Sequence, residues 1–237
     1  MRDFTPQRIV SAEALAKKIL EDRAYYERVR TNTERMGGLV PEIRAAYRRL
    51  KQIYAEAAFP SLYFVVGRRN SGGTSSDRAL MLGAEMFSDE GSRIRFQDIV
   101  PVVVHELAHF QHRTGEGKGP SLLRVAMGEG AADFVAEQLV GRHTNEDLKS
   151  YGDSHEHELW RRFQTDMLRE DRQGAWLYNG SEKKRMGPPD LGYYMGYKIC
   201  QAYYQYQPDK TEALRAIIEM RDPEAVLRES RYSERFR

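Results

Sequence analysis

The chain has 237 residues, of which 37 are basic, 35 are acidic and 41% are hydrophobic, enough to bury a core in one domain over residues 1–237 or in two smaller ones. A net charge of +2 gives no reason to expect a nucleic-acid or anionic-membrane partner. One cysteine excludes an internal disulfide and a cysteine-rich zinc site, and no apolar run is long enough to span a bilayer.

The N-terminal part, residues 1–58, is expected to be helical. Ser11 is a suitable N-cap for a helix that extends to about residue 29. Gly37-Gly38 predicts a break, and Pro41 begins a second helix that extends to about residue 58 with apolar residues at helical spacing.

The hydrophobic period changes after that helix and predicts a small sheet. Residues 62–66 and 79–87 are short, apolar and rich in residues typical of strands, so we expect a β-hairpin with a long glycine-rich turn. The alternative is that Gly72-Gly73 belongs to a mobile loop over a substrate cleft, where an extended chain binds along a strand edge. The loop has no Gly-Lys-Ser/Thr sequence and therefore is not a phosphate loop.

The stretch from His105 to His109 matches the H-E-x-x-H pattern and follows an apolar run, residues 99–104, that would seat a helix in a core. Residues four apart lie on one helix face, so His105 and His109 can bind one metal ion together. Glu106 lies one step further round the helix, where it can accept a proton from metal-bound water. The alternative without a metal site is a surface helix that carries the motif by chance.

A second motif, from Glu129 to Asp133, begins 20 residues after His109. It predicts the start of another helix at Gly130, after a shorter helix over residues 121–127. Catalytic zinc usually has three protein ligands and an open position, and Glu129 is a suitable third ligand. Asp133, one turn further along, can accept a hydrogen bond from a ligating histidine and fix its tautomer. The alternative for Glu129 is a capping carboxylate at a helix N-terminus.

The remaining histidines do not favour a ligand role. His112 would be too far along the helix axis to share an ion with His105 and His109, and the later histidine of the metzincin pattern is absent. His155 and His157 are two residues apart and point to different sides of a helix, whose N-cap we expect at residue 153 or 154.

The C-terminal part begins with a helical segment and continues into an irregular stretch, residues 176–189, long enough to line a site. Residues 190–204 predict a buried helix on which Gly192 and Gly196 form a close-packing face. Tyr193, Tyr194 and Tyr197 cluster near its start and belong either to an aromatic core or to a site in which one of them, Tyr194 ahead of Tyr197, donates to an oxyanion beside the zinc. Two further helices are expected, over residues 210–220 and 223–230.

The spacing from His109 to Glu129, with Asp133 four residues on, resembles the thermolysin-like zinc peptidases, or gluzincins. Most of the chain after about residue 60 is also similar to an uncharacterised bacterial family of zinc-dependent proteases. The similar segments are 63–67, 70–74, 105–109, 129–133 and 191–197. The resemblance implies an α+β, mostly helical, zincin-like fold, with the sheet and the ligand helices in residues 60–140 and a helical part in 141–237.

We therefore expect a zinc metallopeptidase that holds one zinc ion through His105, His109 and Glu129 and acts on a peptide or protein substrate. Glu106 would activate the bound water, assisted by Tyr194 or Tyr197. The alternatives are a zinc-dependent hydrolase of another amide, a self-processing enzyme, and a non-catalytic zinc-binding domain. The polar N-terminus shows no signal peptide, which indicates a cytoplasmic protein, or a periplasmic or secreted one if Met1 replaces an export signal carried by relatives.

Overall fold

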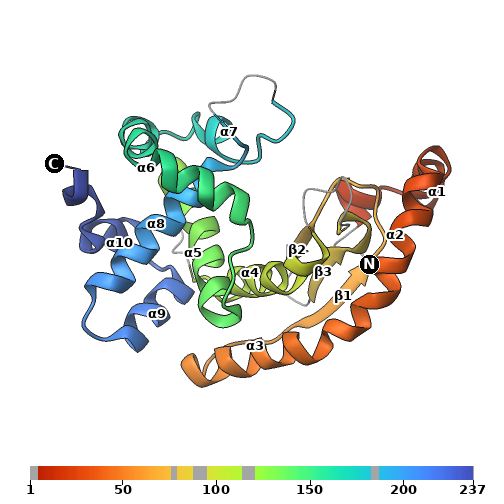
Figure 1. The fold of residues 1–237 in the computed structure, drawn as a ribbon, viewed down its shortest axis with the longest axis horizontal. Coiled ribbons are helices and arrows are strands. Elements are labelled where there is room, and N and C mark those ends of the chain that lie inside the picture. The colour runs from red at the N-terminus through yellow and green to blue at the C-terminus, as the bar shows by residue number, and fades with distance from the viewer. Residues whose placement is uncertain (1–4, 76–78, 88–94, 114–120, 183–186, 237) are drawn as a thin grey trace.

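The computed structural model describes residues 5–75, 79–87, 95–113, 121–182 and 187–236. These residues form an α+β, mostly helical fold with one small sheet, so the coarse fold class expected from the sequence is confirmed. The N-terminal helices run along one side of the molecule, and the C-terminal helices gather at the opposite end (Figure 1). Helices α4 (Ile99–Gln111) and α5 (Leu122–Val140) lie between these two groups.

The N-terminal part begins with a short π-helix, Thr5–Ile9, followed by α1 (Ala12–Glu21), α2 (Arg23–Arg35) and α3 (Val40–Ile53). Ser11 caps α1 as expected, by accepting a hydrogen bond from the backbone N–H of Ala14. The single helix predicted over residues 11–29 is wrong, because the chain leaves helical geometry at Asp22. The predicted glycine break is a 3-10 turn at Met36–Leu39, and α3 ends several residues before residue 58.

The sheet has three strands in the order β1-β3-β2, namely β1 (Ser61–Val65), β2 (Gly73–Ser75) and β3 (Ala79–Gly83). The predicted hairpin between the first and last of these strands is wrong, since β1 pairs with β3 in parallel. The antiparallel partner of β3 is β2, which lies inside the segment expected to be a turn. Gly73 is thus the first residue of a strand and packs against α4.

Helices α6 (Glu146–Asp166), α7 (Gln173–Trp176) and α8 (Leu191–Tyr206) follow α5, and α9 (Lys210–Glu219) and α10 (Pro223–Ser230) end the helical part. Short 3-10 turns lie at Ala84–Met86, Phe96–Asp98 and Tyr232–Phe236. Helix α6 begins at a cap by Asn145, so the N-cap expected at residue 153 or 154 is wrong and His155 and His157 are interior to the helix.

The main core lies where α5 packs along α8. Helix α5 is continuous, which corrects the expected helix start at Gly130. Gly130 allows close packing against α8 and does not mark a helix end. A Cβ at Gly130 would lie 2.0 Å from the backbone nitrogen of Tyr197, and one at Gly196 would lie 1.9 Å from the carbonyl oxygen of Ala126. The close-packing role predicted for Gly196 is therefore confirmed, with Gly130 as its counterpart on α5.

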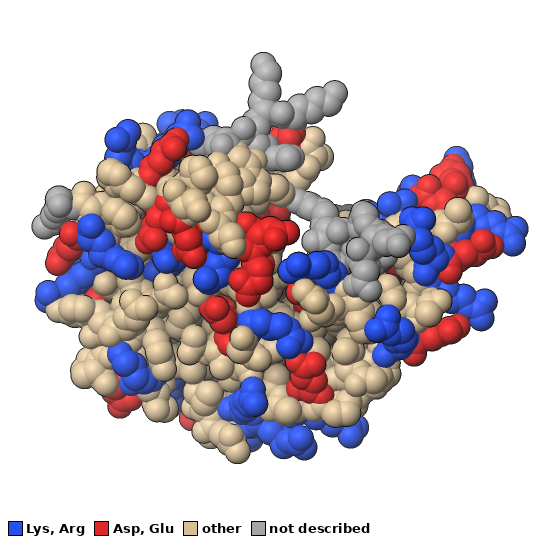
Figure 2. Space-filling view, in the orientation of Figure 1, with Lys and Arg blue, Asp and Glu red and all other residues tan. Residues whose placement is uncertain are grey.

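The surface is of mixed charge. Figure 2 shows acidic and basic side chains interspersed over the face in view. Within the described part of the chain, no helix combines the length and apolar character needed to cross a membrane.

Candidate metal centre

Helix α4 carries two of the candidate ligands on a buried support. Its first half is apolar, and Val103 and Val104 are fully buried against the cores on either side. This burial fixes the rotation of the helix, which places His105 and His109 one turn apart toward α5. Their rings meet edge to face with centroids 4.6 Å apart.

His105, His109 and Glu129 bring one potential ligand atom each to a single point. The two Nε2 atoms are 3.0 Å apart, and Glu129 Oε2 lies 3.1 Å from His109 Nε2 and 3.2 Å from His105 Nε2. These are the three residues that the sequence predicts as ligands. Their side chains are mostly buried, and that of His109 is the most exposed at 22%.

The donor set suits zinc. Zinc binds imidazole nitrogen and carboxylate oxygen at about 2.0–2.2 Å, so neighbouring ligand atoms of a tetrahedral site stand about 3.3 Å apart. The observed triangle, with edges of 3.0 to 3.2 Å, is close to that size. Three protein ligands leave a fourth position for another group.

Asp133 lies behind His105 and is almost fully buried. His105 Nδ1 donates to Asp133 Oδ1 at 2.7 Å, and the hydroxyl of Thr144 donates to the same oxygen at 2.6 Å. With a proton held on Nδ1, His105 would offer the lone pair of Nε2 to a bound metal ion. Burial raises the pKa of Asp133, but the charge and hydrogen bond of His105 outweigh it, and the pKa is lowered overall.

Glu129 has a different partner on each carboxylate oxygen. Oε2 faces the two histidines, whereas Oε1 accepts a hydrogen bond from the hydroxyl of Tyr178 at 2.5 Å. Burial raises the pKa of Glu129, but the hydrogen bonds from His105 and His109 hold it well below its usual value. Tyr178 belongs to the irregular stretch expected to line a site, although no sequence motif selects it.

Two further residues complete the surroundings: Tyr193, which belongs to the predicted tyrosine cluster but was not the favoured member, and His112, which the sequence disfavours as a ligand. The ring of Tyr193 stacks on His105 at 6.0 Å and meets Tyr178 edge to face at 6.2 Å. His112 Nδ1 lies 3.4 Å from His109 Nδ1, on the side away from the centre. Burial lowers the pKa of His112 to about 3, so this ring is neutral and can accept the Nδ1 proton of His109. His112 therefore supports a ligand rather than acting as one.

Glu106 is not among the three residues that converge. Its carboxyl lies against Gly73 of β2, where a Cβ would approach Glu106 Oε1 to 2.7 Å. A glycine at this position thus leaves room for the carboxyl between α4 and the strand. Glu106 lies on the same helix as the histidines, and its carboxyl is turned to β2.

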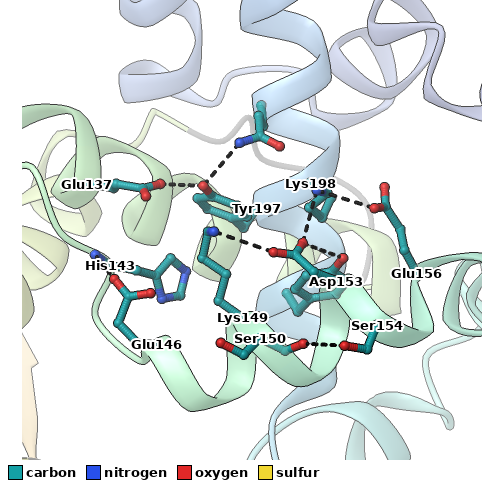
Figure 3. Close-up of polar contacts among 12 residues, drawn as sticks. Glu137, His143, Glu146, Lys149, Ser150, Asp153, Ser154, Glu156, Tyr197 and Lys198 are labelled. Atoms are coloured by element: carbon teal, nitrogen blue, oxygen red, sulfur yellow. Dashed lines mark hydrogen bonds and ion pairs between the residues drawn. The ribbon is translucent and has the colours of Figure 1, made fainter.

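Tyr194 and Tyr197 point to other partners. The hydroxyl of Tyr194 donates to Asp153, and that of Tyr197 donates to Glu137 on α5. Figure 3 shows Tyr197 in this network, in which Lys198 also lies between two carboxylates of α6. Both tyrosines are almost fully buried, so the aromatic-core alternative describes their position, and the tyrosine rings beside the centre are those of Tyr178 and Tyr193.

We expect Tyr197→Phe to lower the free energy of unfolding by about 1.5–3 kcal/mol, because the hydroxyl loses its hydrogen bond to the Glu137 carboxylate and the one it accepts from Gln201, while the ring is retained. Zinc affinity should not change, since the hydroxyl donates to Glu137 rather than to a residue of the centre. Urea unfolding and zinc titration of the same sample measure both quantities. A large loss of zinc affinity at unchanged stability would place the hydroxyl at the metal instead.

The fold and the centre define a mostly helical α+β protein with a two-histidine, one-glutamate cluster set between α4 and α5. Residues 2–234 match the model of a family described as gliding motility protein GldB, and the chain belongs to this family. Neither the curated proteins nor the solved structures include a match to the chain.

Family membership corrects the function expected from the motifs. The assignment to a zinc protease family is wrong, because the family model that spans nearly the whole chain is one of gliding motility proteins. The expectation of a metallopeptidase with a peptide substrate is wrong for the same reason. The catalytic roles expected of Glu106, Tyr194 and Tyr197 depended on that enzyme and lose their support with it.

Proposed function

We propose that this chain is a non-proteolytic component of a gliding motility apparatus and that it holds one zinc ion through His105, His109 and Glu129. The family description supports the first half of the proposal. The second half rests on one observation, the convergence of three ligand atoms of the types zinc prefers.

The position of the cluster suggests what the ion would do. His105 and His109 come from α4, and Glu129 comes from α5, which is also the helix that packs along α8. A bound ion would join these two helices and offer positive charge and one open coordination position near the surface. It would also neutralise the mostly buried carboxylate of Glu129, whose Oε2 faces the two histidines.

Two measurements test the two halves of the proposal separately. Elemental analysis of the purified chain should give close to one zinc per chain, and removal of the ion by a chelator should lower the thermal midpoint. In the source cells, deletion of the coding sequence should abolish surface gliding, and reintroduction of the unchanged chain should restore it. A purified chain that holds no metal after exposure to zinc would contradict the metal centre, and a deletion strain that still glides would contradict the motility role.

We expect Asp133→Asn to weaken zinc binding by roughly 10–100-fold, the usual effect of losing an outer partner of a ligating histidine. Asparagine keeps the shape of the side chain but loses the negative charge that favours a proton on His105 Nδ1. Competition with a chromogenic chelator measures the affinity. Asp153→Asn is a matched control, because Asp153 pairs with Lys198 in α8 and should leave zinc affinity unchanged.

A further inference from the structure

The carboxylate of Glu129 is shared between the centre and Tyr178. Oε2 is the oxygen that faces both histidine Nε2 atoms, while Oε1 receives the Tyr178 hydroxyl. A carboxylate whose second oxygen accepts a hydrogen bond is poised to bind a metal ion through one oxygen only. Nothing in the sequence motif selects this arrangement, because Tyr178 lies 49 residues from Glu129.

The backbone at Tyr178 is held in an unusual conformation. Its φ is +56°, in the left-handed region that a tyrosine seldom adopts. The residue is 63% exposed, so burial in a core does not impose this backbone conformation. The contacts that hold the ring are the hydrogen bond to Glu129 and the edge-to-face contact with Tyr193. A strained backbone that delivers one side chain to a polar cluster is typical of a functional position.

We propose that Tyr178 is a positioning residue that keeps Glu129 a one-oxygen ligand and so preserves an open position on the bound ion for a small exogenous anion. This inference rests on the proposed metal centre. With Oε1 engaged by Tyr178, two nitrogens and one oxygen coordinate the ion, and water or an anion takes the remaining place. Without the hydroxyl, Oε1 is free to turn toward the ion and fill that place.

Cobalt(II) in place of zinc gives the readout, because its visible absorption is strong in four-coordinate sites and weaker when the coordination number rises. We expect the cobalt-loaded wild-type chain to show the four-coordinate spectrum and to respond to added azide, used as the probe anion. The cobalt-loaded Tyr178→Phe variant should show a weaker visible band and at least about tenfold weaker azide binding, on the scale of outer-partner effects. Phenylalanine removes only the hydroxyl from an exposed ring, so the fold is preserved.

Tyr206→Phe is the matched control, because Tyr206 is also half exposed but lies at the end of α8 and contacts Arg231. Its spectrum and azide affinity should equal those of the wild type. If Tyr178→Phe also equals the wild type in both measurements, the positioning role is overturned while the metal centre stands. If the wild-type chain binds neither cobalt nor zinc, the metal centre itself is overturned, and with it this inference.

Discussion

Gly130→Ala is expected to destabilise the fold by at least about 3 kcal/mol, at or above the upper end of the usual cost of overpacking. The added methyl would lie 2.0 Å from the backbone nitrogen of Tyr197 and 2.2 Å from the carbonyl carbon of Gly196. Both are backbone atoms of α8, so the contact can be relieved only if one helix moves away from the other. A typical domain has only about 5–15 kcal/mol of stability, so much of the population should unfold on mild heating.

The same helix offers a control of opposite sign. Gly128 also lies within α5, and a Cβ there would meet nothing within 4 Å. Alanine is the better helix former, so Gly128→Ala should stabilise the chain by roughly 0.5–1 kcal/mol. Urea unfolding of the metal-free proteins measures both changes. Equal stability of the two variants would show that α5 and α8 do not pack as closely as described.

The requirement for glycine at position 130 also illustrates what the sequence could and could not predict. The pattern Glu129-Gly-Ala-Ala-Asp133 suggested a helix start, because glycine disfavours helix interiors. In the fold, the cost of Gly130 is offset by the close approach of α8, which only the tertiary structure supplies. The predicted pairing of the strands is wrong for a similar reason. Strand patterns do not distinguish a hairpin from a parallel pair, and β1 and β3 pair in parallel.

The candidate ligands can be predicted from the sequence, because residues one helical turn apart lie on the same face of a helix. His105 and His109 meet through the helical repeat alone, and the Glu129–Asp133 spacing places two carboxylates on one face of the next helix. The tyrosines depend instead on how α8 rotates and on a left-handed residue in a loop. A helix pattern cannot show that Tyr193 faces His105 while Tyr194 turns to Asp153. Nor can a ligand pattern identify the protein family, which the match over nearly the whole chain supplied.

The largest expected loss of zinc affinity is that of variants in which a ligand itself is replaced. His109→Ala should weaken zinc binding by more than the 10–100-fold typical of an outer partner, and the double variant with Glu129→Gln should retain no measurable zinc. His109 is the suitable histidine to remove, because its side chain is the more exposed of the two. Loss of His105 would instead leave the buried carboxylate of Asp133 without its charged partner, so misfolding would obscure the result.

A ligand that binds only the folded chain raises its stability, by about 2.7 kcal/mol when present at one hundred times its dissociation constant. Zinc should therefore raise the thermal midpoint of the wild-type chain and not that of the double variant. His155→Ala is the control, since His155 is an exposed histidine within α6 that stacks on Tyr151, and it should bind zinc like the wild type. Near-stoichiometric zinc in a folded double variant would refute the centre. Loss of zinc in that variant, with normal gliding when it replaces the wild-type chain in cells, would separate the metal from the motility role and leave the ion a purely structural part.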